Sequence, residues 1–255
     1  MTWNVTPQPH KVFERNPLVA VIVELRFFPI LKLADKIADV QERLRGTFPA
    51  YQDVTRQLVN LQPAGPVELR NERLFNFVKA DESSMLSLST SALALESRRH
   101  ERRETFIADA KVGLDALVDV CGPVVPTRLG LRYVDIIDKE AIEKDLGRAT
   151  SWSSLVSERF MAVPTGLADH DETLFACEVG SAMPGGGGQT VRYGLIQDTD
   201  RRIKFRLDVD RYLDQPGDAS KLVELLGAFA DDLFAVFVAA MGTDLKAWMP
   251  EKKRT

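Results

Sequence analysis

Two short segments carry charged residues whose spacing suggests a binding site. The pattern L-R-F around Arg26 and the pattern L-R-Y around Arg132 each place an arginine between an aliphatic and an aromatic residue. Glu24 and Arg26 fall on one face of a strand because side chains alternate. We expect Glu24, Arg26, Arg132 and Tyr133 to form an anion- or partner-binding pair of strands in a central cleft. The favoured alternative is a cross-strand salt bridge between Glu24 and an arginine.

Basic side chains alternate with apolar ones along Arg202–Asp208. The apolar set predicts packing on a helix, and the basic set predicts an outward sheet face that is able to follow phosphates. The candidate phosphate-facing residues are Arg192, Arg202, Lys204 and Arg206. Aspartates are interleaved with them, and no aromatic residues alternate with the charges as base-stacking platforms do. We therefore favour a solvated face whose charges neutralise one another.

Residues for catalysis or metal binding are sparse, because the chain has only 2 cysteines and 3 histidines. The run Asp169–Glu172 offers one imidazole and three carboxylates, but no further ligand follows with the spacing of a metal site. It predicts a polar loop. The glycine run Gly185–Gly188 lacks the following helix and the Lys-Ser/Thr pair of a phosphate loop, so it predicts a flexible hairpin connection. We predict no catalytic residues, no metal site and no cofactor.

Composition and charge are those of an ordinary globular protein. Of the 255 residues, 45% are hydrophobic and 27% are charged, which argues against disorder. The net charge of −4 leaves no general basic field for nucleic acid or an anionic membrane. The first residues do not resemble a signal peptide, and the apolar run Leu233–Thr243 is shorter than the roughly 20 residues that span a bilayer. We expect a cytoplasmic protein without membrane attachment.

The hydrophobic pattern of the first half predicts strands and two helices. The expected strands cover Val19–Phe27, Gln57–Gln62, Val67–Ala80 and Met85–Ala94. The expected helices cover Leu33–Leu44 and Phe106–Cys121, the second ending at Gly122-Pro123. The mixed-charge run Arg98–Glu104 predicts the start of this second helix.

The second half repeats this order. Strands are expected at Leu129–Ile137, Leu174–Val179, Val191–Gln197 and Ile203–Val209. Two short helices are expected around Ile142–Leu146 and Trp152–Val156, and a long helix with a broad apolar stripe around Leu222–Ala240.

The two halves therefore look like one unit present twice. A shift of 119 residues places Leu74–Ser91 on Tyr193–Asp210 without a gap, and the same shift superposes the two long helices. We predict an α+β protein of two tandem β-α-β-β-β-α pseudo-repeats, residues 1–123 and 124–255, that form one compact domain. Its antiparallel sheet would pack on long helices, as in TBP-like or helix-grip folds.

Two motifs resemble the signatures of a known family. They are N-P-L at Asn16–Leu18 followed by E-L-R-F at Glu24–Phe27, and R-L-G-L-R-Y at Arg128–Tyr133. Both are similar to motifs of a sporadically distributed, functionally uncharacterised bacterial family of about this length. The resemblance implies no established activity and no catalytic residues. The patchy distribution of that family implies mobile or defence-linked gene neighbourhoods.

These observations predict a non-enzymatic binding or interaction protein. Strand edges left open by the sheet favour a homodimer or a protein partner. One alternative is a small-ligand sensor that uses the cleft between the repeats. A second alternative is nucleic-acid binding through the basic sheet face, which would weaken steeply with salt. An enzyme ranks last.

Overall fold

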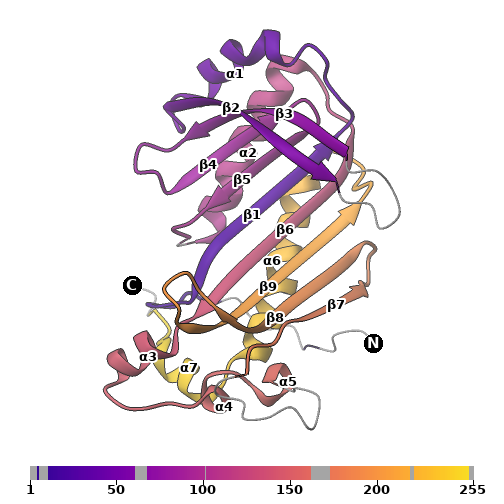
Figure 1. Cartoon of the computed structure of the whole chain (residues 1–255). Coiled ribbons are helices and arrows are strands. Elements are labelled where there is room, and N and C mark those ends of the chain that lie inside the picture. Colours follow the sequence, from indigo (N-terminus) through magenta and orange to yellow (C-terminus); the bar gives the residue numbers. More distant parts are fainter. Residues whose placement is uncertain are drawn as a thin grey trace. The chain divides into compact units, whose positions relative to one another are not determined.

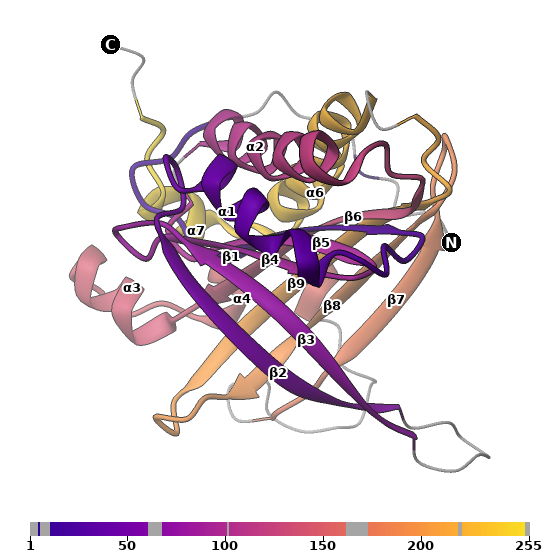
Figure 2. The ribbon, with the colours of Figure 1, turned by 90° about the horizontal axis from the view of Figure 1, so that it is seen from above.

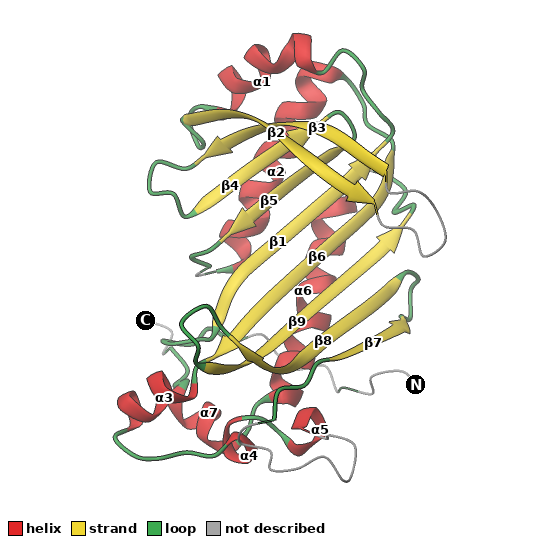
Figure 3. Cartoon of the chain, viewed as in Figure 1, coloured by secondary structure: helices red, strands yellow, loops and turns green. Residues whose placement is uncertain are grey.

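The computed structural model describes residues 5, 11–60, 68–100, 102–161, 173–218 and 221–252. Its strands are β1 (Leu18–Phe27), β2 (Ala50–Asn60), β3 (Glu68–Val78), β4 (Ser84–Ser89), β5 (Ala92–Ser97), β6 (Pro126–Ile137), β7 (Cys177–Ala182), β8 (Gly188–Gln197) and β9 (Ile203–Asp214). They form a nine-stranded antiparallel sheet in the order β2-β3-β4-β5-β1-β6-β9-β8-β7 (Figures 1 and 3). The fold class is α+β, as the sequence predicts.

The described residues also form helices. They are η1 (Ala34–Lys36), α1 (Ile37–Leu44), α2 (Arg103–Cys121), α3 (Lys139–Leu146), α4 (Trp152–Leu155), α5 (Glu158–Met161), α6 (Leu222–Ala240) and α7 (Thr243–Trp248). The expected helices are confirmed at α1, α2, α3, α4 and α6. None of these described helices combines the length and apolar character that crossing a membrane requires.

The chain divides into two compact units, which are described separately. Unit 1 comprises Met1–Val21, Gly130–Leu213 and Glu224–Thr255, and unit 2 comprises Ile22–Leu129 and Asp214–Val223. The pseudo-repeat boundary between residues 123 and 124 stays a prediction.

In unit 2, helix α2 covers one face of the strands (Figure 2). Alternate side chains of β3 and β4, among them Phe75 and Leu86, point to that face and are buried. Phe75 is the register partner of Leu88, so the two strands share one apolar surface. A Cβ added to Gly113 of α2 would lie 2.7 Å from the Leu86 side chain. Glycine at this position therefore permits the helix to lie close to the sheet.

One expected strand is in fact two. The segment Met85–Ala94 contains all of β4 except Ser84, then a turn and the start of β5, with Ser89 paired to Ala92. The expected single strand is wrong because the turn residues include neither glycine nor proline, and the alternation of apolar and polar residues continues on both sides of the turn. The first half therefore contains one strand more than the predicted pattern.

The gapless alignment of the two hairpins is also wrong at its first strand. The loop between β3 and β4 has six residues outside the register, 79–84, whereas the loop between β8 and β9 has five, 198–202. The shift of 119 residues therefore aligns Phe75, which faces inward, with Gly194. The inward-facing residue of β8 is the next one, Leu195, so the two strands are out of register by one residue. One deleted loop residue turns every earlier side chain to the opposite face.

In unit 1, helix α6 packs on the inward face of β9 (Figure 1). Phe205 and Leu207 of β9 are fully buried there. Arg211 joins the helix to the sheet, because its guanidinium lies 4.6 Å from the Phe229 ring centre and its Nε donates to Asp232 at 3.0 Å. The opposite face of β6, β9, β8 and β7, turned away from α6, is called the outer face below.

Candidate interaction surface on the outer face of unit 1

Strand alternation separates two of the predicted site residues. Arg132 lies on the outer face, with a side chain that is 37% exposed. Tyr133 is the next residue of β6 and is buried on the inward face. Because neighbouring strand residues point to opposite faces, the two side chains do not contribute to one surface. The pairing of Arg132 with Tyr133 in one site is therefore wrong.

Arg132 holds a buried carboxylate. Its Nε and Nη2 donate to the two oxygens of Asp208 at 2.7 Å each, a bidentate pair between β6 and β9. Arg206 Nη2 donates to the same carboxylate at 2.5 Å. Asp208 is fully buried, whereas the Arg206 side chain is 39% exposed. We call Arg132, Asp208 and Arg206 the arginine cluster.

Asp208 and Arg132 are both charged at neutral pH. Burial alone would raise the pKa of Asp208, but the hydrogen bonds and positive charges of Arg132 and Arg206 outweigh it and hold that pKa below its usual value. The hydrogen bond to Asp208 raises the pKa of Arg132 in turn. The cluster thus fixes two guanidinium groups on one carboxylate.

A row of alternating charges extends from the arginine cluster to the edge of the sheet. Arg192 of β8 is the register partner of Asp208, and Glu178 of β7 is the partner of Arg192. Arg192 Nε donates to Glu178 at 2.7 Å, and its side chain is 40% exposed. With Asp210 of β9, whose negative charge also raises the pKa of Arg132, three arginines face three carboxylates on this part of the outer face.

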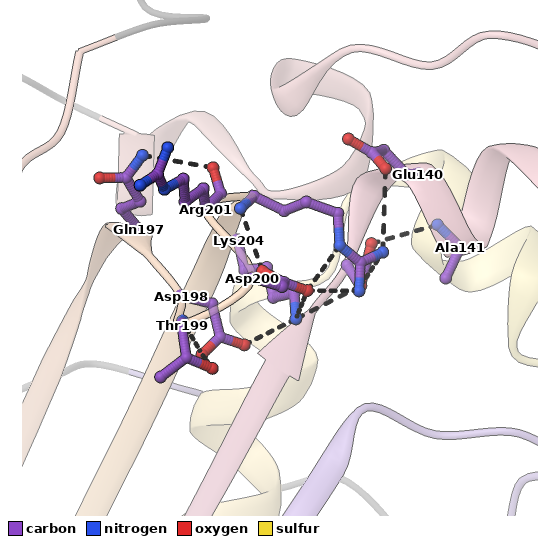
Figure 4. A network of polar contacts seen from close by, with 10 residues as sticks. Glu140, Ala141, Gln197, Asp198, Thr199, Asp200, Arg201 and Lys204 are labelled. Atoms are coloured by element: carbon purple, nitrogen blue, oxygen red, sulfur yellow. Dashed lines mark hydrogen bonds and ion pairs between the residues drawn. The ribbon is translucent and has the colours of Figure 1, made fainter.

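A second network surrounds Lys204 at the start of β9 (Figure 4). Its Nζ donates to Asp198 at 2.6 Å and to Asp200 at 3.1 Å, and lies 3.6 Å from Asp138. The hydrogen bond from Lys204 to Asp198 raises the pKa of the ammonium group. The sequence predicts an outward-facing Lys204, but the structure buries it beneath these carboxylates.

Arg202 fastens the same turn to α3. Its guanidinium lies 3.0 Å from Asp138 and 2.6 Å from Asp200. Asp138 also accepts from the backbone N–H of Ala141, so it caps α3. The backbone N–H of Arg202 and the cationic side chains lower the pKa of Asp200 to about 2. The network has a structural explanation, since it holds the β8–β9 turn against the helix.

The predicted neutralisation of the basic strand is confirmed. Each candidate phosphate-facing side chain has an acidic partner within 3.0 Å, and these side chains are Arg192, Arg202, Lys204 and Arg206. The hairpin connection at Gly185–Gly188 is confirmed between β7 and β8. The run Asp169–Glu172 lies outside the described residues.

One acidic residue near the arginine cluster was missed by sequence reasoning. Asp135 lies on the inward face of β6 and is only 4% exposed. Within the described part of the chain its carboxyl group has no hydrogen-bond or ion-pair partner. Burial raises its pKa to about 8, and the negative charge of Asp208 adds to the effect. The available signal was an aspartate at an inward position of an alternating strand.

Glu24 and Arg26 form an ion pair in unit 2. Arg26 Nε donates to Glu24 at 2.5 Å, and both side chains are well exposed. The favoured salt bridge is therefore present, but within one strand rather than between two strands. Since these residues belong to unit 2 while Arg132 and Tyr133 belong to unit 1, the central cleft stays a prediction.

Comparison of the chain with protein-family models and with curated proteins finds no match. The function is therefore argued from the geometry of the outer face. That geometry defines a polar face of paired charges on an α+β fold, and the arginine cluster is part of it.

Proposed function

We propose that this chain is a non-enzymatic binding protein that docks an acidic protein partner on the outer face of unit 1. One observation carries the proposal: the buried carboxylate of Asp208 fixes the half-exposed guanidinium groups of Arg132 and Arg206 side by side. Each guanidinium has five N–H donors, and Asp208 occupies only some of them. Because Arg206 Nε is buried, the donors that a carboxylate of the partner would use are the remaining ones on the terminal nitrogens.

The fixed geometry favours affinity. A free surface arginine loses rotamer freedom when it is bound, at a cost of about 0.5–1.5 kcal/mol per side chain. Two hydrogen bonds to Asp208 already hold Arg132 in the free protein. Most of its rotamer entropy is therefore lost when the protein folds, and little is left to lose when a partner binds. Arginine is also enriched among the few residues that dominate protein interfaces.

The charge pattern supports a protein partner over nucleic acid. The arginines around Arg192 are balanced by Asp208, Asp210 and Glu178. The adjacent Lys204 network opposes two cations with the four carboxylates of Asp138, Glu140, Asp198 and Asp200. A phosphate backbone requires a continuous positive surface. A protein with interspersed charges suits a surface of both signs.

The biological setting extends the same proposal. Action in the bacterial cytoplasm and a role in a mobile or defence-linked system follow from the sequence expectations and from the family resemblance. A second copy of the chain is the alternative partner.

The test uses the tagged full-length chain expressed in its own host. We compare partner recovery for wild type, for Arg206→Gln and for the control Arg56→Gln, since Arg56 is also an exposed strand arginine paired with a carboxylate. A stoichiometric polypeptide should co-purify with wild type and with the control. We expect Arg206→Gln to reduce recovery about tenfold, the effect of a central contact. Equal recovery with all three proteins, or none with wild type, overturns the proposal.

A further inference from the structure

A separate cavity lies in unit 2, between the β3–β4 turn and the beginning of α2. Its volume is about 360 Å³. Basic and hydroxyl side chains dominate its lining, and they include Lys79, Ser83, Ser84, Arg99, Arg102 and Thr105. Ligand pockets for small molecules begin at about 300 Å³, so the cavity suits a small ligand.

Two arginines in this cavity differ from their neighbours. Arg99 and Arg102 are exposed and make no ion pair or hydrogen bond with any residue that the structure describes. By contrast, Arg98, beside them in the sequence, donates to Glu96 at 2.7 Å. On the outer face of unit 1, cationic side chains pair with carboxylates. The two arginines that line this cavity have no such partner among the described residues.

The carboxylates of the cavity are already engaged. Asp109 accepts from Lys79 Nζ at 2.5 Å. Asp81 accepts from the hydroxyl and the backbone N–H of Ser83, and these hydrogen bonds lower the pKa of Asp81. The described lining therefore sets three cations, Lys79, Arg99 and Arg102, against the carboxylates of Asp81 and Asp109, a net charge of +1. The guanidinium donors of Arg99 and Arg102 have no partner in the part of the chain that the structure describes.

We propose that this cavity binds a small phosphate-bearing ligand, a function distinct from partner docking on unit 1. Two guanidinium groups offer paired N–H donors to the oxygens of a phosphate group. Ser84 and Thr105 add hydroxyl donors, and no side chain caps the first turn of α2. These donors exceed what the two oxygens of a carboxylate accept, whereas three phosphate oxygens accommodate them.

The test titrates the full-length protein with inorganic phosphate at constant ionic strength, following backbone amide shifts by NMR. Wild type, the double variant Arg99→Gln/Arg102→Gln and the control Arg98→Gln are compared. The control removes one positive charge from the same segment, but its side chain does not line this cavity. Amide spectra without phosphate establish that each variant is folded.

We expect saturable shifts in wild type that include the amides of Ser83 and Thr105. The double variant should weaken binding at least about tenfold, and the control should stay within about twofold. The proposal is overturned if wild type shows no saturation, if the double variant binds as wild type does, or if the control loses as much as the double variant.

Discussion

Asp135→Asn should stabilise the protein at neutral pH. Asp135 is buried without a hydrogen-bond partner among the described residues, and its pKa rises from 3.8 to about 8. Asparagine keeps the shape of the side chain but carries no ionisable group. The variant therefore removes the cost of keeping this carboxyl group protonated.

The sign follows from the two pKa values. Between about pH 4 and pH 8 the folded protein holds a proton on Asp135 that the unfolded chain has released. The free energy of unfolding therefore falls as the pH rises through this window, by about 1.4 kcal/mol per pH unit. At pH 7 the accumulated loss is about 4 kcal/mol, and Asp135→Asn should recover up to that amount.

The assay is urea unfolding between pH 4 and pH 8, followed by the fluorescence of buried Trp152. The quantity of interest is the difference between variant and wild type, because other titrating groups cancel in it. We expect this difference to be near zero at pH 4 and to grow with pH. The control Asp119→Asn, at an exposed helix position, should change stability by less than about 0.5 kcal/mol at every pH.

A pH-independent difference would refute the reasoning. So would a variant that is less stable than wild type at pH 7, since the reasoning predicts a gain in stability there. A stabilisation that appears only below pH 5 would also contradict a raised pKa.

Three further changes follow from the same structure. Arg132→Gln leaves the buried Asp208 with Arg206 as its remaining arginine partner in the cluster. The free energy of unfolding should therefore fall by about 2 kcal/mol or more in thermal unfolding. An unchanged melting temperature would contradict the arginine cluster. Lys204→Met should lower the melting temperature more than Arg202→Met, because Lys204 is buried among carboxylates, and the reverse order would argue against that burial. Gly185 and Gly187 both have positive φ, but only at Gly187 would a Cβ meet the Tyr212 backbone. Gly185→Ala should therefore cost about 1 kcal/mol and Gly187→Ala clearly more, as denaturant unfolding would show.

Long periodic elements could be predicted from the sequence. The apolar stripe of α6 repeats over several helical turns, and the alternation along β1 and β6 repeats over several residue pairs. Single residues that break such a pattern therefore do not hide it. Helices α5 and α7 have four and six residues, which is too short for a periodic signal. The β4–β5 turn was missed because its residues are not strong turn formers.

The candidate surfaces could be predicted only in part. Strand alternation places Arg132 and Arg206 on the outer face, but their shared carboxylate depends on how β6 and β9 lie together, across 76 residues of sequence. Arg99 and Arg102 were visible in the sequence as part of a charged run. Their cavity depends on the β3–β4 turn lying near the beginning of α2, a tertiary arrangement without a local sequence signal.

The most direct test of the binding function is the native mass of the protein, purified gently from its own host. The account predicts a complex in which the 28.5 kDa chain carries a second, acidic polypeptide. The Arg206→Gln variant should release that polypeptide under the same conditions. A bare 28.5 kDa species from wild-type cells, at concentrations where the tagged chain is abundant, would contradict the account.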